Sequence, residues 1–533
     1  MGARSRWWGA LSAVLVAAAT AAVPAVVPAE AIGPNLLPLT VTNNSGRSEA
    51  VYLYVLGTDI RPGGGLGYVN RAGAFTRWPA GANPPVPAPD VSITAPGNGG
   101  SITLQVPRFI SGRVYMSFGE KLKFFLTPDG LVQPAPWSPG DPNRNILFDW
   151  SEFTYNDAGL WLNSSQVDQF AVPHAVSVTG ANGQTKRTGD LVDNGRETVI
   201  AGIRNQPGWA NTILTRSDGT VLRVLAPGKA ADAGLFSPTY LDPYITQAWN
   251  AYTGKNLTVV PFTDQPGIRY TGRTSGTTMH FTDSAGRRVA SFAKPSTSNV
   301  WGCDGALHAP NDTVVGPIAR TLCAALHRST LGTIDTQPSG GPGDFYRGTL
   351  TNHYSRLIHQ NMVDGKAYGF AFDDVLAQES LVHDGDPRAA AIILTPFGSG
   401  GSGPQPGGSA IASNWHNKCI DVPNWNFADG QRLIVWNCTG GTNQKWQFTN
   451  GTLRTENNKC MDVAWGSVAD GAAVQIATCS GNPAQQFVLT AAGDLVNPQA
   501  NKCVDIAEWN PNNDAVLQMW TCAGTANQKW RRI

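Results

Sequence analysis

Two acidic side chains, Glu152 and Asp168, lie in neighbouring segments whose residue types are typical of β-strands. If the two segments form adjacent strands, the carboxyl groups can face each other across a groove. Paired carboxyl groups of this kind hydrolyse glycosidic bonds: one donates a proton to the leaving oxygen, and the other activates a water or attacks the sugar. The alternative is that both are solvated surface carboxylates without a chemical role.

The segment 148–157 predicts a strand with one polar and one apolar face, because side chains alternate along a strand. Phe153 and Tyr155 point to the side that can enter a core. The polar face consists of Glu152, Thr154 and Asn156. A second strand over 166–170 would place Gln166 and Asp168 on a common face, so that Asp168 could face Glu152 if the two strands are adjacent.

Signatures of other catalytic classes are missing from the sequence. It contains no HExxH metal motif, no G-x-S-x-G nucleophile elbow and no GxxxxGK phosphate loop. The eight cysteines form an even set, so none is left over as a nucleophile. We therefore expect neither a metal nor an organic cofactor.

Charge and composition narrow the class of protein further. The net charge is only +1, from 39 basic and 38 acidic residues, so a nucleic-acid partner is not expected. The 59 Gly, 37 Pro and 14% charged residues favour short strands joined by turns. Helices are predicted at 241–252, where Asp242 can cap the first turn, and at 318–326. Further strands are predicted at 51–56, 102–106 and 113–118.

Composition also divides the chain. Residues 1–31 have a basic start, an apolar stretch and the small-x-small site Ala29-Glu30-Ala31, which predicts a secretory signal peptide. Residues 398–409 contain only Gly, Ser, Pro and Gln, so they predict a flexible linker. The chain is therefore expected to consist of a signal, a β-rich body over 32–397, the linker and a tail over 410–533. A secreted protein can form disulfides, and no membrane partner is expected after the signal is removed.

The tail contains three copies of one pattern. Each copy has a Cys-x-Asp element, a second cysteine 19 residues after the first, and a Gln-x-aromatic element. Equal spacing in three copies predicts the local disulfides Cys419–Cys438, Cys460–Cys479 and Cys503–Cys522. Cys303 and Cys323 are the two cysteines of the body, and they are expected to pair with each other.

The tail resembles the ricin B-type β-trefoil, also called carbohydrate-binding module family 13. The resemblance implies that Trp446, Phe487 and Trp530 fill the pseudo-threefold core. It also implies that the aspartate of each Cys-x-Asp accepts hydrogen bonds from a sugar, against which an aromatic side chain stacks. The first copy would bind through Asp421, Trp436, Asn443 and Gln444. The third would bind through Asp505, Gln518, Trp520, Asn527 and Gln528.

The second copy keeps Asp462, Gln475 and Gln485, but has Ala477 and Ala484 where the other copies have Trp and Asn. We therefore predict that the first and third copies bind sugar and that the second binds weakly. Three further tryptophans, Trp425, Trp465 and Trp509, lie five or six residues after each first cysteine. They are either additional stacking surfaces or packing residues.

The body resembles glycoside hydrolase family 64, the laminaripentaose-producing endo-β-1,3-glucanases, most clearly over 148–170. The segment 366–375 is similar to the Tyr-x-(Tyr/Phe)-Ala-x-Asp-Asp element of thaumatin-like proteins. The resemblance implies a mainly β fold, with a thaumatin-like β-sandwich and a barrel-like part that form a groove. It implies that Glu152 is the general acid and Asp168 the general base of an inverting mechanism. Thr154, Asn156 and Trp161 would contact glucan, whereas Asp373 and Asp374 either line the cleft or are structural.

The expected protein is thus a secreted, monomeric β-1,3-glucanase with a carbohydrate-binding tail, and its product would be a pentasaccharide. Two other interpretations are open. The body could bind β-glucan without cutting it, as a lectin-like protein. It could also hydrolyse another polymer, such as xylan or chitin, because trefoils of this type accompany many enzymes.

Overall fold

The structure is a computed structural model that describes residues 33–397, 409–449, 451–455, 459–490 and 492–533. The chain forms two compact units, Met1–Gly403 and Pro404–Ile533. The predicted signal peptide lies outside the described residues, as does the predicted linker up to residue 408. Within the described ranges, no helix is both long enough and apolar enough to span a bilayer.

The first unit contains two large sheets that pack face to face. One has the strand order β15-β14-β24-β1-β7, with bounds Thr185–Thr188, His174–Gly180, Pro387–Leu394, Leu36–Asn43 and Ser101–Pro107. The other has the order β23-β12-β11-β8-β2-β3-β4, with bounds Leu381–Asp384, Gly159–Ser164, Leu147–Asn156, Ile110–Phe118, Val51–Asp59, Leu66–Val69 and Phe75–Arg77. A short strand, β6 (Ile93–Thr94), also pairs with β2. Val41, Ile392, Val114 and Phe153 belong to the shared core, so the predicted β-sandwich is confirmed.

The outer face of the larger sheet carries a second core, which is rich in aromatic residues. It contains Tyr54, Tyr115, Phe148 and Trp150 from β2, β8 and β11. A small sheet in the order β10-β9-β5 lies nearby in sequence, with bounds Gly130–Val132, Phe125–Thr127 and Val86–Pro87. Along β11 the outer face changes from Phe148 and Trp150 to Glu152, Thr154 and Asn156, so the polar residues begin where the aromatic core ends.

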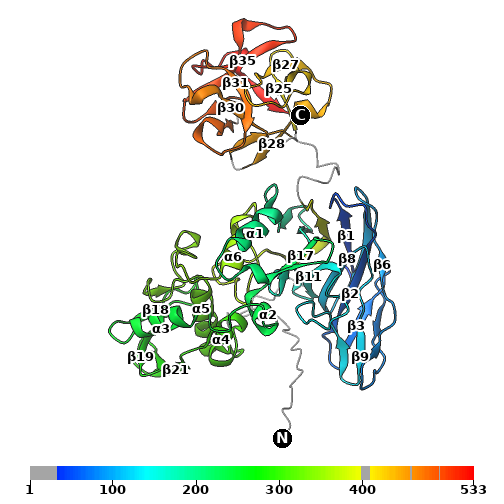
Figure 1. Cartoon of the computed structure of the whole chain (residues 1–533), viewed down its shortest axis with the longest axis vertical. Helices are drawn as coiled ribbons and strands as arrows, with labels where there is room; N and C mark the ends of the chain where they lie inside the picture. The colour runs from blue at the N-terminus through cyan, green and yellow to red at the C-terminus, as the bar shows by residue number, and fades with distance from the viewer. Residues whose placement is uncertain (1–32, 398–408, 450, 456–458, 491) are drawn as a thin grey trace. The chain divides into compact units, whose positions relative to one another are not determined.

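The remainder of the first unit is the part that was expected to be barrel-like. It has six helices: α1 (Gly195–Arg204), α2 (Pro227–Asp232), α3 (Asp242–Ala251), α4 (Thr297–Gly302), α5 (Val315–His327) and α6 (His353–Gln360). It also has two small sheets, β13-β17-β16 (Gln169–Phe170, Val221–Leu225, Ile213–Thr215) and β21-β20-β19-β18-β22 (Arg288–Ala293, Thr278–Thr282, Tyr270–Ser275, Leu257–Val259, Thr336–Gln337). These elements share one core, and Figure 1 shows α3, α4, α5, β18, β19 and β21 on the other side of this unit from β1, β2 and β8.

Both predicted helices exist, as α3 and α5. The prediction that Asp242 caps α3 was wrong, because Leu241 occupies the cap position and Asp242 is the first helical residue. The Asp242 carboxylate instead accepts hydrogen bonds from the backbone N–H and the hydroxyl of Thr297, at 3.1 and 2.6 Å. It thereby joins the start of α3 to the start of α4.

The second unit is a β-trefoil of twelve strands. The strands β25–β36 span Ser409–Ser413, Lys418–Asp421, Ile434–Asn437, Lys445–Thr449, Thr452–Arg454, Lys459–Val463, Val474–Thr478, Val488–Leu489, Leu495–Asn497, Lys502–Ile506, Ala515–Trp520 and Trp530–Arg532. Trp446, Phe487 and Trp530 are buried in one core, as predicted. Ser409, predicted as the last linker residue, is the first residue of β25.

All four predicted disulfides are present. Cys303–Cys323 joins the end of α4 to α5. Cys419–Cys438, Cys460–Cys479 and Cys503–Cys522 each connect neighbouring strands within one third of the trefoil. Each third, or lobe, of the trefoil is therefore cross-linked at the same place relative to its Cys-x-Asp element.

Candidate active site

Glu152 is the sixth of the ten residues of β11, on the polar face that the sequence predicts. Thr154 and Asn156 are partly exposed on that face, and Phe153 and Tyr155 are buried on the other. In the sheet, Glu152 is directly opposite Arg113 of β8 and Asn163 of β12. Because directly opposed residues point to the same side of a sheet, the register itself places a cation beside the Glu152 carboxylate.

Asp168 also lies beside Arg113, but it is on a bend and not on the strand that the sequence predicts. The prediction of a continuous strand over 166–170 was wrong, because β12 ends at Ser164 and Asp168 lies in a bend before the short strand β13. Gln166 does not face the site: its side chain is buried and bonds to Ser164 and to the backbone of Tyr368. The bend, rather than alternation along a strand, turns Asp168 toward Arg113.

Arg113 contacts both acidic side chains. Its Nη2 atom lies 2.9 Å from Glu152 Oε1 and 3.7 Å from Asp168 Oδ2, so these two oxygens are at most about 6.6 Å apart. The guanidinium also lies over the ring of Trp150, 4.5 Å from its centroid. Burial opposes its charge, but Tyr115, Glu152 and Asp168 together raise the pKa of Arg113 above its usual value, so it remains a cation.

A second cation faces only Asp168. Lys229 Nζ lies 3.4 Å from Asp168 Oδ1, and it also lies 4.6 Å from the centroid of the Trp137 ring. Lys229 is in the first turn of α2, which follows β17 directly and starts at Pro227. The backbone carbonyl of Asp168 accepts from Ala226 N–H, so the bend and the start of α2 are fixed to each other.

The buried carboxyl group of Asp149 forms hydrogen bonds with the backbone just after the Asp168 bend. Its Oδ2 accepts hydrogen bonds from the backbone N–H groups of Ala171 and Val172, at 2.9 and 3.0 Å. Burial raises the pKa of Asp149 to about 7, although these hydrogen bonds act in the opposite direction. Since Ala171 follows Asp168 by three residues, the position of Asp168 depends on this contact.

The predicted glucan contacts lie on the same sheet face as Glu152. Thr154 is opposite Trp161, which is opposite His383 of β23, and the rings of Trp161 and His383 are stacked with centroids 4.2 Å apart. One face of Trp161 is therefore covered, and the other is the one that can meet a sugar. Thr154 shares a hydrogen bond of 2.8 Å with Ser111, and Asn156 accepts one of 2.8 Å from Ala158 N–H in the β11–β12 turn.

Asp373 and Asp374 have different surroundings. Asp373 is fully buried, and its carboxylate pairs with Arg328 and His359, each at 2.9 Å. Burial alone would raise the pKa of Asp373, but His359 and Arg328 lower it below the usual value, so this aspartate is a buried anion with a structural role. Asp374 is partly exposed and forms an ion pair with Arg320.

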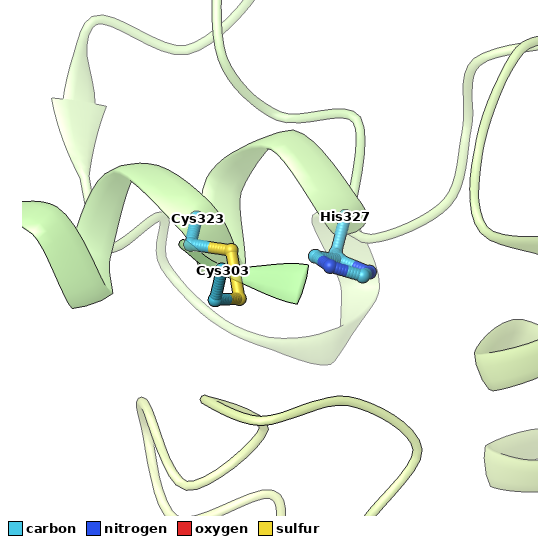
Figure 2. Close-up of side chains that lie close together, drawn as sticks. All are labelled: Cys303, Cys323 and His327. Atoms are coloured by element: carbon cyan, nitrogen blue, oxygen red, sulfur yellow. A yellow bond between two sulfur atoms is a disulfide. The ribbon is translucent and has the colours of Figure 1, made fainter. Parts of the chain in front are cut away.

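Among the described residues, one group of side chains has the spacing of a metal site: Cys303, Cys323 and His327 (Figure 2). The two sulfur atoms form a disulfide and are therefore not thiolate ligands. Both nitrogens of His327 have partners, since Nε2 lies 2.7 Å from the carbonyl of Val300 and Nδ1 lies 2.9 Å from Asn352 Nδ2. Burial lowers the pKa of His327 to about 4, so the ring is neutral and structural.

In the trefoil, amide side chains surround each aspartate of the repeated pattern. Asp421 accepts from Asn443 and Gln444 at 2.9 and 2.8 Å. Asp505 accepts from Gln518, Asn527 and Gln528 at 3.0, 2.7 and 3.0 Å. Burial raises the pKa of Asp421 and of Asp505 above the usual value, and the amide hydrogen bonds oppose this shift. The polar residues predicted for the first and third lobes are thus brought together in each lobe.

The aromatic residues complete this comparison of the three lobes. Trp436 and Trp520 lie directly opposite Cys419 and Cys503, which precede the aspartates by two residues on the same strand, and Trp520 is 43% exposed. In the second lobe the residue opposite Cys460 is Ala477. Asp462 there accepts from Gln475 and Gln485 at 3.0 and 3.2 Å. The second lobe therefore keeps the hydrogen-bond acceptor, Asp462, but has Ala477 where the other lobes have a tryptophan.

Sequence reasoning missed Arg113, Lys229 and Asp149. Arg113 is the one cation in the predicted strand 113–118, which was a usable signal. Lys229 and Asp149 gave no comparable signal, because their contacts with the Asp168 segment depend on how distant segments pair.

Comparisons with known proteins agree with this geometry. A family model described as β-1,3-glucanase, glycoside hydrolase family 64, matches residues 35–394, and one described as ricin-type β-trefoil lectin domain matches residues 409–530. A glucan endo-1,3-β-glucosidase of Cellulosimicrobium cellulans is 45% identical over 466 residues, which is 84% of this chain and 84% of that protein.

Two solved structures are also similar. A laminaripentaose-producing β-1,3-glucanase in complex with laminaritetraose is 53% identical, with a TM-score of 0.66, and the match covers 68% of this chain and 99% of that one. A β-1,3-glucanase domain from Clostridium beijerinckii, at 24% identity and a TM-score of 0.56, shares the fold, and the match covers 68% of this chain and 98% of that one. The chain therefore belongs to glycoside hydrolase family 64, the β-1,3-glucanases, and carries a C-terminal ricin-type β-trefoil lectin domain.

Proposed function

We propose that this protein is a secreted endo-β-1,3-glucanase that inverts the anomeric configuration, and that its trefoil holds it on polysaccharide. The observation that carries the proposal is the pair of carboxyl groups, Glu152 and Asp168, joined by Arg113 at the polar end of β11. Membership of family 64 supports β-1,3-glucan as the substrate. The resemblance that supports inversion is to the same family.

The distribution of cations supports separate roles for the two carboxyl groups. Asp168 contacts both Arg113 and Lys229, whereas Glu152 contacts Arg113 alone. A general base must be ionised before the reaction, and neighbouring cations favour that state. Asp168 is therefore the better base, and Glu152 is the better acid. Both Arg113 contacts with Glu152 fall on Oε1, and neither involves Oε2.

The reaction follows from these roles. Asp168 takes a proton from a water molecule as the water oxygen bonds to the anomeric carbon. The bond from that carbon to the glycosidic oxygen breaks on the opposite face of the sugar, and Glu152 donates its proton to the departing oxygen. Trp161, Thr154 and Asn156 would hold the adjoining glucose units on the same sheet face. The first product of inversion at a β-linkage is the α-anomer.

Two substitutions test the roles, with a matched control on the same strand pair. Glu152→Gln and Asp168→Asn should each lower laminarin hydrolysis by about 10²- to 10⁴-fold, the usual worth of a positioned acid or base. Asp157→Asn is the control: its side chain is 70% exposed and its partner, Arg108, lies outside the site. Near-normal turnover in either test variant would refute the assignment, and NMR detection of a β-anomer as first product would refute inversion.

The substrate is tested by reducing-sugar release from curdlan, xylan and chitin. Release from curdlan alone supports the proposal. Release from xylan or chitin instead would favour a hydrolase of another polymer, and binding to curdlan without release would favour a lectin-like protein. We also propose a pentasaccharide product, which is supported by the 53% identical structure described as laminaripentaose-producing. Chromatography of the curdlan products checks this length.

For the trefoil, we propose that the first and third lobes bind sugar in pockets and that the pocket of the second lobe is weak. Trp436 and Trp520 lie opposite the cysteines of the first and third lobes, whereas Ala477 takes this position in the second lobe, and this difference supports the ranking. Asp421→Ala should therefore reduce glucan binding more than Asp462→Ala does. An equal loss from both substitutions would overturn the ranking.

Secretion is supported by the predicted signal peptide over 1–31 and by four disulfides, which form in oxidising compartments. N-terminal sequencing of protein recovered from the culture medium should begin near Ile32. A monomer is also proposed, and sedimentation at micromolar concentration should give the mass of one chain.

A further inference from the structure

Trp465 of the second lobe is fully exposed, at 100% of its accessible surface. It is also a bulky residue with a positive backbone φ of 60°, in the left-handed region that side chains other than Gly rarely adopt. The left-handed turn recurs in the other two lobes, so the backbone conformation belongs to the fold. The exposure of the indole is the feature that packing does not explain, because the side chain buries no surface.

The position of the tryptophan in this turn differs between the second lobe and the other two. Each lobe has two successive left-handed residues after its Cys-x-Asp strand: Asn424-Trp425, Trp465-Gly466 and Glu508-Trp509. The tryptophan takes the second of these positions in the first and third lobes, and the first position in the second lobe. The second lobe has therefore moved its tryptophan by one residue and placed Gly466 where the others have an indole.

The contacts of the three tryptophans differ in line with this one-residue shift. Trp425 is 59% exposed and lies against Gly441, since a Cβ on that glycine would be 3.4 Å from its ring. Trp509 is 50% exposed and meets the edge of Trp415, with ring centroids 5.2 Å apart. Trp465 has no ring contact of this kind among the described residues. Both faces of its indole are open to a ligand.

The turn that carries Trp465 lies beside the incomplete pocket of the same lobe. A Cβ on Gly466 would be 3.8 Å from the Cβ of Ala484, the residue that replaces the pocket Asn. Ala484 precedes Gln485, whose amide donates to Asp462. The second lobe thus keeps its hydrogen-bond acceptor, Asp462, and has Ala477 where the other lobes have a tryptophan. The indole of Trp465 lies on the adjoining turn instead.

We propose that Trp465 is a polysaccharide-binding platform that stacks on the face of a glucose unit of β-1,3-glucan and gives the second lobe its own mode of binding. All hydroxyls of β-glucose are equatorial, so each face of the ring presents C–H groups that an indole can cover without hydrogen bonds. A platform of this type suits the surface of an insoluble polymer, where three lobes act together through avidity. The choice of polymer rests on the proposed function.

The test uses the full chain with Glu152→Gln in the background, so that curdlan is bound without being cut. Trp465→Ala should raise the apparent Kd for insoluble curdlan about fivefold, the effect of losing one aromatic contact of moderate strength. Trp465→Phe should retain most of the affinity, because a phenyl face can still stack. Val468→Ala is the matched control: this neighbouring side chain is apolar and 55% exposed, but not aromatic.

Three results would overturn the proposal: unchanged curdlan binding in Trp465→Ala, an equal loss in Val468→Ala, or an equal loss of binding to cellulose and mannan. The glucanase activity is checked separately with Trp465→Ala in the otherwise native chain. The ratio of its laminarin turnover to that of the native chain is compared with the ratio of the two curdlan affinities, so that a failure of the platform and a failure of the glucanase assignment give different results.

Discussion

The protein uses aspartate and glutamate in two contrasting settings. In the body, Glu152 and Asp168 are held by cations, Arg113 and Lys229, whose charges partly neutralise them. In the trefoil, Asp421 and Asp505 are held by amides, which orient the carboxylate and leave its charge uncompensated. Both settings position carboxyl oxygens through two or more contacts. The negative charge is partly neutralised in the body and is left uncompensated in the trefoil.

This difference matches the two tasks that we propose. An acid–base pair exchanges protons and develops charge during the reaction, so nearby cations both hold it and stabilise the altered charge. A sugar-binding aspartate undergoes no reaction, and it binds best as an uncompensated acceptor for hydroxyl groups. Replacing a cation partner in the body should therefore lower turnover, and replacing an amide partner in the trefoil should lower affinity.

Among substitutions of the partners of these carboxyl groups, the largest effect is expected from Arg113→Gln, which replaces the shared cation of the body with an amide. Turnover of laminarin should fall about 10- to 100-fold, because a hydrogen bond to a charged group contributes about 1.5–3 kcal/mol. Curdlan binding through the trefoil should not change. Arg108→Gln is the control, since Arg108 pairs with Asp157 rather than with the proposed catalytic pair. Unchanged turnover would show that the cation is not needed.

A smaller effect is expected from Lys229→Gln. Lys229 contacts Asp168 alone, at 3.4 Å, and its side chain is 33% exposed, so the pair is weakened by solvent. Turnover should fall about fivefold, because Asp168 keeps its contact with Arg113. Turnover at the native rate in Lys229→Gln would show that this second cation is not needed.

The sequence was sufficient where a pattern is local. Alternation along 148–157 identified the polar face with Glu152, because the side-chain period of a strand is fixed by its backbone. Equal spacing in three copies identified the trefoil disulfides, because each lobe repeats the same local structure. The buried Trp446, Phe487 and Trp530 followed from the resemblance to ricin B-type trefoils.

The sequence was insufficient where position depends on distant contacts. Asp168 lies in a bend that the buried Asp149 carboxylate fixes through Ala171 and Val172, and no local pattern encodes this contact. The partner Lys229 arrives with α2, which is placed by the pairing of β13 with β17. Strand-like residue types around Asp168 therefore led to the wrong local structure, although the carboxyl group still reaches the site.

In the trefoil, replacing one amide should have a modest effect. Gln528→Leu removes one of the three amides that donate to Asp505, and a single such hydrogen bond contributes about 0.5–1.5 kcal/mol. The Kd for curdlan should rise about threefold, with laminarin turnover unchanged. Gln485→Leu is the matched control in the second lobe, where the pocket is proposed to be weak. An equal loss from both substitutions would show that the lobes do not differ in this respect.

The smallest effect is a pH dependence that should distinguish the amide-held carboxylates. Burial raises the pKa of Asp421 and Asp505 above the ordinary value of 3.8, so on acidification they lose their charge before an exposed aspartate does. Glucan binding should therefore be full at neutral pH and should weaken, about twofold at first, while the pH is still above 3.8. The chain with both Asp421→Asn and Asp505→Asn should bind less at neutral pH and lose this dependence. If binding to curdlan stays constant down to pH 3.8 in the native chain, the ionised aspartates are not the acceptors, and the contrast between the two settings does not hold.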